Sequence, residues 1–133
     1  MCGFVGFSGY LENRAEVLER MMNRIIHRGP DMADMFMDQS VALGFRRLSI
    51  IDLSEAGRQP MQNRQGNVTV VFNGEIYNFE ALRAELEEKG HHFSTRTDTE
   101  TLIHGYEEWG EGMVDRLRGM YAFVIWDSVK RTL

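Results

Sequence analysis

The chain has 133 residues, a length typical of one domain with a buried core, and it carries 15 basic against 20 acidic residues. The resulting net charge of -5 repels phosphate backbones, which excludes nucleic acid as an expected partner. The single cysteine cannot form a disulfide within the chain, and without an evident secretion signal or membrane-spanning run we expect a cytoplasmic protein with no membrane partner.

The first third of the chain predicts a strand, a helix and further strands. "CGFVGF" (2–7) has the composition of a short buried strand, and the periodicity of 12–29 predicts an amphipathic helix that Gly29 and Pro30 end. Its apolar face is expected to contain Leu18, Met21, Met22, Ile25 and Ile26. Strand-like segments follow at "DMFM", "VALGF" and "RLSII".

The remainder predicts a loop, a strong strand, helices and a last strand. The polar stretch 54–67 reads as a loop before the strand "VTVVF". A helix over 78–90 is predicted to be capped by Asn78, and further helices are predicted at 98–110 and 113–119, before the strand "MYAFVIWD". One α+β domain over 1–133 follows, and because a strand to pair with 121–126 would come next, we expect it to be truncated at the C-terminus.

Cys2 is the first candidate for chemistry. A lone cysteine is usually a small core residue, but removal of Met1 would leave this thiol beside a free α-amino group with a reference pKa of about 7.7–8.0. Such an amine can act as general base for its own side chain, and the thiolate is intrinsically nucleophilic. The hypothesis depends on Met1, because an attached methionine would convert the amine into an amide.

The pair Asn73–Gly74 follows the strand "VTVVF" and has two interpretations. Asn-Gly is the most frequent turn signal of a two-residue hairpin. A helix pattern rather than a strand follows it, however, and an asparagine amide with a glycine N–H can also stabilise a developing oxyanion. The sequence favours neither interpretation over the other.

Three charged residues fit the recognition of a free amino acid. A planar guanidinium suits an α-carboxylate and carboxylates suit an α-ammonium, so Arg47, Glu75 and Asp98 could supply that set. Taken one at a time, each is more often a solvated surface charge or, for Asp98, a helix cap.

The four histidines give no metal-site pattern. His91 and His92 follow a predicted helix end, His27 lies in a last helical turn, and His104 has an isolated helical position. Without an i, i+4 histidine pair or a CxxC motif, we expect no metal site.

Together these segments resemble a known family. "MCGFVGF", "HRGPD", "RRLSIIDLS", "GRQPM", "FNGEIYNF", "TDTETLIHGYEEWG" and "LRGMYAFVIWD" look like the class II glutamine amidotransferase domain of glutamine-hydrolysing asparagine synthetases, in the family's order. The resemblance implies the N-terminal-nucleophile (Ntn) hydrolase fold, a four-layer α/β/β/α sandwich of two antiparallel sheets. It also implies a glutaminase that passes ammonia to a synthetase domain.

The resemblance also assigns roles to residues. Cys2 matches the nucleophile, Asn73 and Gly74 the oxyanion hole, Arg47 the group that binds the glutamine carboxylate, and Glu75 and Asp98 those that hold its ammonium. It implies L-glutamine as substrate, no cofactor or metal for this domain, and a partner synthetase domain, absent here, that uses ATP and Mg²⁺. It is compatible with a homodimer.

Two alternatives stay open from the sequence. The chain could be a non-catalytic binding or regulatory fragment of this fold, which a retained Met1 and missing strands would favour. It could also be an amidotransferase domain that serves another synthetase.

Overall fold

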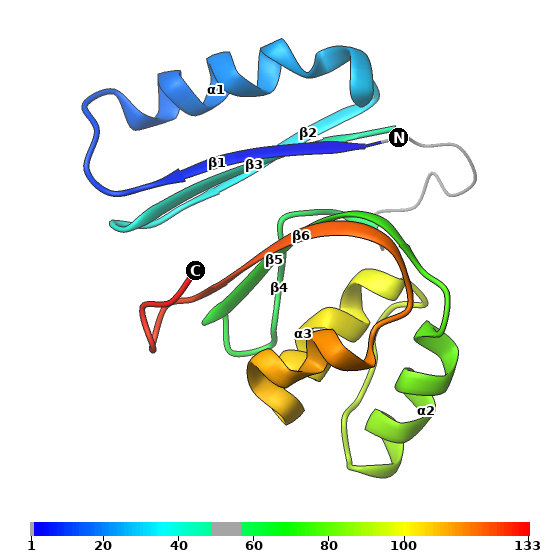
Figure 1. Ribbon diagram of the computed structural model, residues 1–133. Coiled ribbons are helices and arrows are strands. Elements are labelled where there is room, and N and C mark those ends of the chain that lie inside the picture. The colour runs from blue at the N-terminus through cyan, green and yellow to red at the C-terminus, as the bar shows by residue number, and fades with distance from the viewer. Residues whose placement is uncertain (1, 49–56) are drawn as a thin grey trace.

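The computed structural model describes residues 2–48 and 57–133. Its elements in chain order, labelled in Figure 1, are β1 (Gly3–Ser8), α1 (Arg14–Arg24), η1 (Ile26–Arg28), β2 (Met32–Met37), β3 (Val41–Arg47), β4 (Met61–Gln62), β5 (Val68–Ile76), α2 (Phe79–Glu88), α3 (Asp98–Trp109), η3 (Gly110–Arg116) and β6 (Gly119–Asp127). Among the described residues, no helix has the length and apolar character needed to cross a membrane.

The first sheet is antiparallel, with strand order β1-β3-β2. Because side chains alternate along a strand, Ala42 and Gly44 of β3 face α1, while the neighbouring Leu43 faces the other way. Leu18 and Met22 of α1 pack on Ala42, and a Cβ atom at Gly44 would lie 2.6 Å from the Met22 side chain. The small residues of β3 therefore let α1 approach the sheet closely.

The second sheet has the order β4-β5-β6 and is also antiparallel. One face of β5 presents Val70, Phe72 and Ile76 to the helices. These residues form a buried cluster with Leu82 of α2, Leu102 and Ile103 of α3, and Met113 and Leu117 from the segment before β6. The strongest strand predicted from the sequence is thus the centre of this half of the fold.

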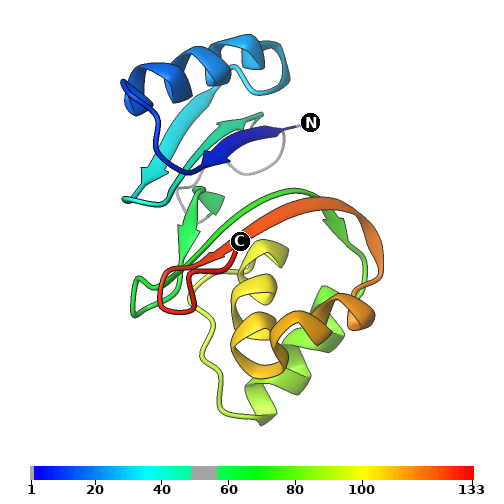
Figure 2. The same cartoon turned by 60° about the vertical axis from the view of Figure 1, so that its left-hand side comes forward.

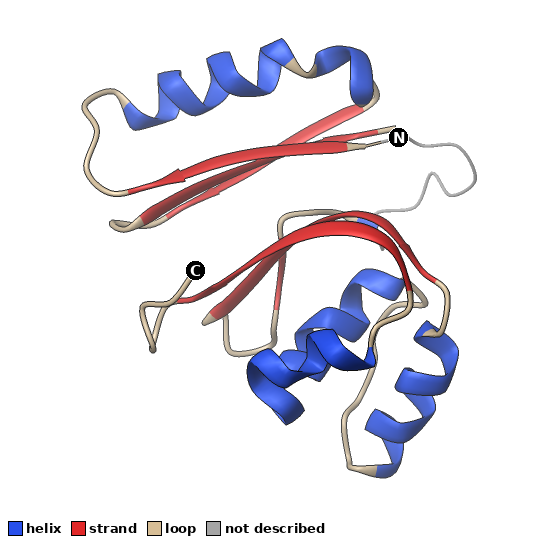
Figure 3. Ribbon diagram, viewed as in Figure 1, coloured by secondary structure: helices blue, strands red, loops and turns tan. Residues whose placement is uncertain are grey.

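The inner faces of the two sheets pack on each other. Val41, Leu43 and Phe45 of β3 contact Val71 of β5 and Trp126 of β6. Figures 1 and 2 show α1 outside the first sheet and α2 with α3 outside the second, and Figure 3 separates the helix and strand layers by colour. The predicted four-layer α/β/β/α sandwich is confirmed.

A hydrogen bond also joins the two sheets. Nε1 of Trp126 donates to Oδ2 of Asp38 across 2.6 Å. Burial opposes ionisation of Asp38, but this bond and those from the backbone N–H groups of Val41 and Ser40 lower its pKa. The carboxylate therefore anchors β6 to the turn between β2 and β3.

Several local predictions need correction. The first helix ends at Arg24, and Ile26, predicted on its apolar face, lies in η1 with 48% of its surface exposed. The predicted loop over 54–67 contains the short strand β4. The predicted strand "RLSII" begins with the last residue of β3, and most of it lies outside the described residues.

Asn78 precedes α2 as predicted, but its side chain does not cap the helix. Its Nδ2 donates to the carbonyl of Arg116, and its Oδ1 accepts from the N–H of Arg118. Asn78 therefore fixes the segment that leads into β6, because a tertiary pair of hydrogen bonds replaces the local one.

Candidate active site

Cys2 lies immediately before β1, half-buried between the two sheets. It packs against the cluster that includes Phe45 and Val71, one residue from each sheet. Its Sγ accepts a hydrogen bond from the N–H of Leu48 at 3.4 Å and contacts the Leu48 carbonyl at 3.8 Å. The thiol is thus held at the end of β3, on the inner side of the sandwich.

Arg28 positions the start of the chain, a role that the sequence reasoning missed. Its Nε donates to the carbonyl of Cys2 across 3.1 Å, and its side chain lies against Gly3. A Cβ atom at Gly3 would lie 3.2 Å from Nε and Cδ of Arg28. Arg28 belongs to the segment "HRGPD", and the position of that segment in the family pattern was the only signal that could have indicated it.

Asn73 and Gly74 do not form a hairpin turn. They lie inside β5, where Asn73 pairs with Ala122 and Gly74 with Tyr121 of β6. Ile76 faces the helices like Val70 and Phe72, so the alternation of β5 continues through Gly74. Asn73 and Glu75 therefore share the face of Val71, the residue that packs near Cys2.

Gly74 is required by the backbone. Its φ is +153°, and a Cβ atom there would lie 2.2 Å from the carbonyl oxygen of Met120. No side chain can be placed at that distance, so only glycine lets β5 and β6 pair at this position.

Asp98 and Glu75 are neighbours at the end of β5. Oδ2 of Asp98, the first residue of α3, accepts from the N–H of Ile76 at 3.1 Å. Burial raises the pKa of Asp98, the hydrogen bond from Ile76 lowers it, and the negative charge of Glu75 raises it again, with a net upward shift. Thr97 occupies the N-cap position and Asp98 is the first helical residue, so Asp98 is not the cap of the helix. Two carboxylates in this arrangement favour the arrival of a cation.

Arg47, the last residue of β3, approaches the same region from the other sheet. A Cβ atom at Gly57 would lie 3.1 Å from Nη2 of Arg47 and 3.8 Å from Cγ2 of Thr97. The guanidinium and the start of α3 therefore border the same glycine. Because Gly57 has no side chain, the guanidinium has room at this position.

A series of contacts and chain neighbours links the six residues predicted from the sequence. Cys2 contacts Leu48, which follows Arg47, and Arg47 and Thr97 both border Gly57. Thr97 precedes Asp98, which binds the end of β5, where Asn73, Gly74 and Glu75 lie. The thiol and the guanidinium thus lie at the end of β3, and the two carboxylates lie at the end of β5.

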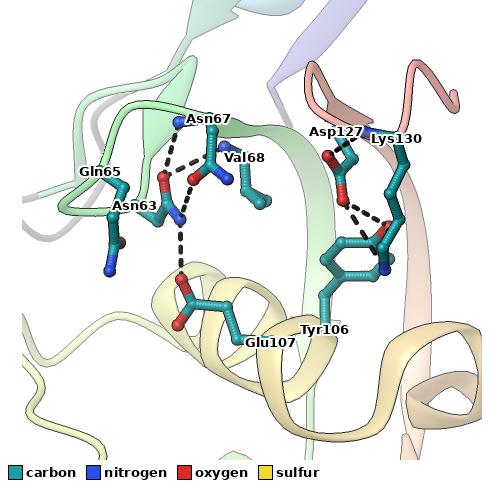
Figure 4. Close-up of a pocket in the computed structure, with 8 residues that line it drawn as sticks. All are labelled: Asn63, Gln65, Asn67, Val68, Tyr106, Glu107, Asp127 and Lys130. Carbon is teal, nitrogen blue, oxygen red and sulfur yellow. Dashed lines mark hydrogen bonds and ion pairs between the residues drawn. The ribbon is translucent and has the colours of Figure 1, made fainter.

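Among the described residues, a cavity of about 340 Å³ lies at the other end of β5 from Asn73 and Gly74 (Figure 4). Its lining includes Val68 and Asp127, the pair at the start of β5, with Asn63, Tyr106 and Glu107. It is therefore separate from the region around Cys2.

Comparison with known proteins identifies the family. The family model described as "Glutamine amidotransferase domain" matches residues 1–133. The chain belongs to this glutamine amidotransferase family. The predicted resemblance is confirmed at this level.

Among curated relatives, this amidotransferase domain is 46% identical over 133 residues to asparagine synthetase [glutamine-hydrolyzing] 1 of Bacillus subtilis, covering 96% of this chain and 21% of the relative. It is 42% identical over 132 residues to asparagine synthetase [glutamine-hydrolyzing] 2 of Oryza sativa subsp. japonica, covering 96% of this chain and 22% of the relative. The chain therefore spans about one fifth of the length of these relatives.

A solved structure shares the fold of the amidotransferase domain. Glutamine phosphoribosylpyrophosphate amidotransferase from B. subtilis superimposes with a TM-score of 0.78 at 20% sequence identity, covering 96% of this chain and 35% of that one. The predicted Ntn hydrolase architecture is consistent with this likeness, which at such identity concerns the fold alone.

Proposed function

We propose that this domain, residues 1–133, hydrolyses L-glutamine to L-glutamate and ammonia. The observation that carries the proposal is the thiol of Cys2 between the sheets, beside the β5 face that presents Asn73. The names of the relatives indicate the substrate, because they describe glutamine-hydrolysing enzymes.

The first half of the reaction forms a thioester. After removal of Met1, the α-amine of Cys2 takes the thiol proton, and sulfur bonds to the side-chain carbonyl carbon of glutamine. Asn73 and Gly74 stabilise the oxyanion, and the N–H of Leu48, 3.4 Å from Sγ, holds the sulfur in place. The C–N bond then breaks, and the ammonium formed on Cys2 gives its proton to the departing nitrogen, which leaves as ammonia.

The second half regenerates the enzyme. The amine takes a proton from water, the hydroxide adds to the thioester carbonyl, and the C–S bond breaks. Sulfur regains a proton as glutamate leaves. Arg28 holds the carbonyl of Cys2 through both steps, so that the backbone of the nucleophile keeps its position.

The charged residues hold the amino-acid end of glutamine. Arg47 binds the α-carboxylate as a bidentate pair, and Glu75 and Asp98 bind the α-ammonium. Burial and, after it, the negative charge of Glu75 raise the pKa of Asp98, and a bound ammonium would offset both effects.

The ammonia goes to a synthetase domain that makes asparagine from aspartate with ATP and Mg²⁺. The asparagine synthetase relatives support this acceptor. We place the reaction in the cytoplasm, with no cofactor in the amidotransferase domain itself.

The test is glutamate release from L-glutamine by the purified chain, before and after treatment with iodoacetamide. Because the chain has one cysteine, any loss of activity reports on Cys2 alone. We expect alkylation to abolish glutamate release and saturating L-glutamine to slow the alkylation. An alkylated chain that keeps its activity would contradict the proposal.

Asp98→Asn is expected to weaken glutamine binding without loss of stability. The raised pKa means that the folded chain holds this proton more tightly than the unfolded chain, so stability falls as pH rises from the unfolded value of 3.8 through the folded pKa. At pH 7 the ionised carboxylate costs stability, and asparagine removes this cost while still accepting from Ile76. We expect an unchanged or higher Tm at pH 7, a difference that vanishes below pH 3.8, and a KM for glutamine raised at least about tenfold.

Steady-state kinetics and thermal denaturation measure the two effects. Asp115→Asn, an exposed carboxylate of η3, is the matched control and should leave KM unchanged. An unchanged KM in Asp98→Asn would remove Asp98 from the glutamine site.

A further inference from the structure

Two histidines and a carboxylate converge at the side of α3, far from Cys2. Nδ1 of His91 lies 3.1 Å from Nδ1 of His104, and these atoms lie 3.8 and 3.3 Å from Oε2 of Glu107. All three atoms fall within 4.8 Å of one another. The spacing along the chain gave no indication of this cluster, because His91 and His104 are brought together only by the packing of α2 on α3.

Local structure fixes each of the three side chains. Gly90, with φ +95°, ends α2, and the N–H of His91 bonds to the carbonyl of Leu86, the pattern of a Schellman cap. His104 and Glu107 are three residues apart on α3 and so share one helix face. Oε1 of Glu107 accepts from Nδ2 of Asn63 at 2.7 Å, as Figure 4 shows, which leaves Oε2 for the histidines.

The outer ring nitrogens face carboxylates. Nε2 of His91 lies 3.2 Å from Glu108, and Nε2 of His104 lies 3.5 Å from Glu100. A carboxylate on the distal nitrogen is the usual outer partner of a metal-bound histidine, because it fixes the ring and the tautomer that turns a lone pair to the metal.

The number of N–H groups on the two histidine rings also favours a cation between them. Two neutral imidazoles carry two N–H groups in total, and the carboxylate contacts on the Nε2 atoms use both. The close contact between the Nδ1 atoms then joins two lone pairs, which repel unless a cation lies between them. Glu100, Glu107 and Glu108 supply three negative charges, against the ammonium of Lys89, which lies 3.3 Å from Glu108.

We propose that Nδ1 of His91, Nδ1 of His104 and Oε2 of Glu107 bind a divalent transition-metal ion of the zinc type. In tetrahedral coordination, bonds of about 2.0–2.1 Å place neighbouring ligand atoms about 3.3 Å apart, close to the three separations found here. The side chains of His91, His104 and Glu107 are 16%, 14% and 26% exposed, so an ion can enter and water can take the fourth position.

The site is independent of the proposed glutaminase activity. Asp98 starts α3, whereas Glu107 is in its last turn, about 13 Å further along the helix. A bound ion would join the segment after α2 to α3, and we therefore expect it to stabilise the fold rather than to take part in chemistry at Cys2.

The test is titration of the untagged, chelator-treated chain with Co²⁺, followed by visible absorption, and with Zn²⁺ by calorimetry. We expect one ion per chain, the intense absorption of four-coordinate Co²⁺, and a Tm that rises with Zn²⁺. His91→Asn and His104→Asn should each weaken binding by more than the roughly 10–100-fold typical of outer-partner changes. Glu107→Gln, which can still accept from Asn63, should weaken it as well, and circular dichroism verifies that each variant is folded.

Two controls separate this site from other metal ligands. His92→Asn changes an exposed histidine of the same segment, and Cys2→Ser removes the thiol; both should bind Co²⁺ like the unchanged chain. Absence of Co²⁺ and Zn²⁺ binding would overturn the proposal and leave a histidine pair in direct contact as a structural feature only. Binding that survives both His91→Asn and His104→Asn, or that disappears in Cys2→Ser, would overturn it too.

Discussion

Cys2→Ala is expected to abolish glutamate release from L-glutamine. Loss of a catalytic nucleophile typically lowers kcat by a factor on the order of 10⁴ to 10⁶, and no other thiol in the chain can replace this one. Cys2→Ser should fall nearly as far, because a hydroxyl is a much weaker nucleophile than a thiolate at neutral pH. Rates of glutamate release with saturating glutamine measure both losses.

The controls for this experiment concern folding and processing. Cys2 is half-buried at the margin of the core, so both variants should keep the circular dichroism spectrum and the tryptophan fluorescence of the parent chain. Intact mass spectrometry should show that active preparations have lost one methionine. Equal rates in Cys2→Ala and the parent, or full activity in a chain that retains Met1, would contradict the mechanism.

The thiol illustrates how far sequence reasoning reaches. The position of Cys2 next to the start of the chain indicated a nucleophile, and the structure places this residue between the two sheets. Its hydrogen bond with Leu48 and the bond from Arg28 to its carbonyl link residues far apart in the sequence. Such contacts depend on strand register, which local patterns do not encode.

The layers of the fold were predictable for a different reason. The run of β-branched and aromatic residues in "VTVVF" and the periodicity of α1 report burial directly, so this strand and this helix were found close to their true positions. Asn78 and Ile26 were misassigned because tertiary contacts replaced the local cap in one case and a change to 3-10 geometry exposed the side chain in the other. The proximity of His91 and His104 could not be predicted, because the packing of helices and not their spacing in the sequence brings them together.

For Asn73–Gly74, the structure decides between two interpretations that the sequence left open. From the sequence, a hairpin and an oxyanion hole were equal alternatives, since both use the same residue pair. In the structure β5 continues through both residues to Ile76 in register with β6, so the hairpin interpretation is wrong. The role in the oxyanion hole stays a prediction, and mutation of each residue tests it differently.

Asn73→Ala should lower kcat for glutamine hydrolysis by about 10²–10³, or about 2.7–4 kcal/mol, the usual effect of removing one oxyanion donor. KM and Tm should change little, because Asn73 is only half-buried and its amide is needed chiefly in the transition state. Asn67→Ala, a half-buried asparagine just before the same strand, is the matched control and should keep kcat within about twofold. A kcat within twofold of the parent in Asn73→Ala as well would exclude Asn73 from the oxyanion hole.

Gly74→Ala should differ by also lowering Tm. Its Cβ atom would lie 2.2 Å from the Met120 carbonyl, so the pairing of β5 with β6 must open before the residue fits. A kcat loss with an unchanged Tm in Asn73→Ala, beside a joint loss in Gly74→Ala, would separate the donor that acts on the transition state from the glycine that shapes the strand around it. Joint loss in both would instead assign the pair to the structure of the sheet, because a residue that acts only in the transition state cannot alter the stability of the free enzyme.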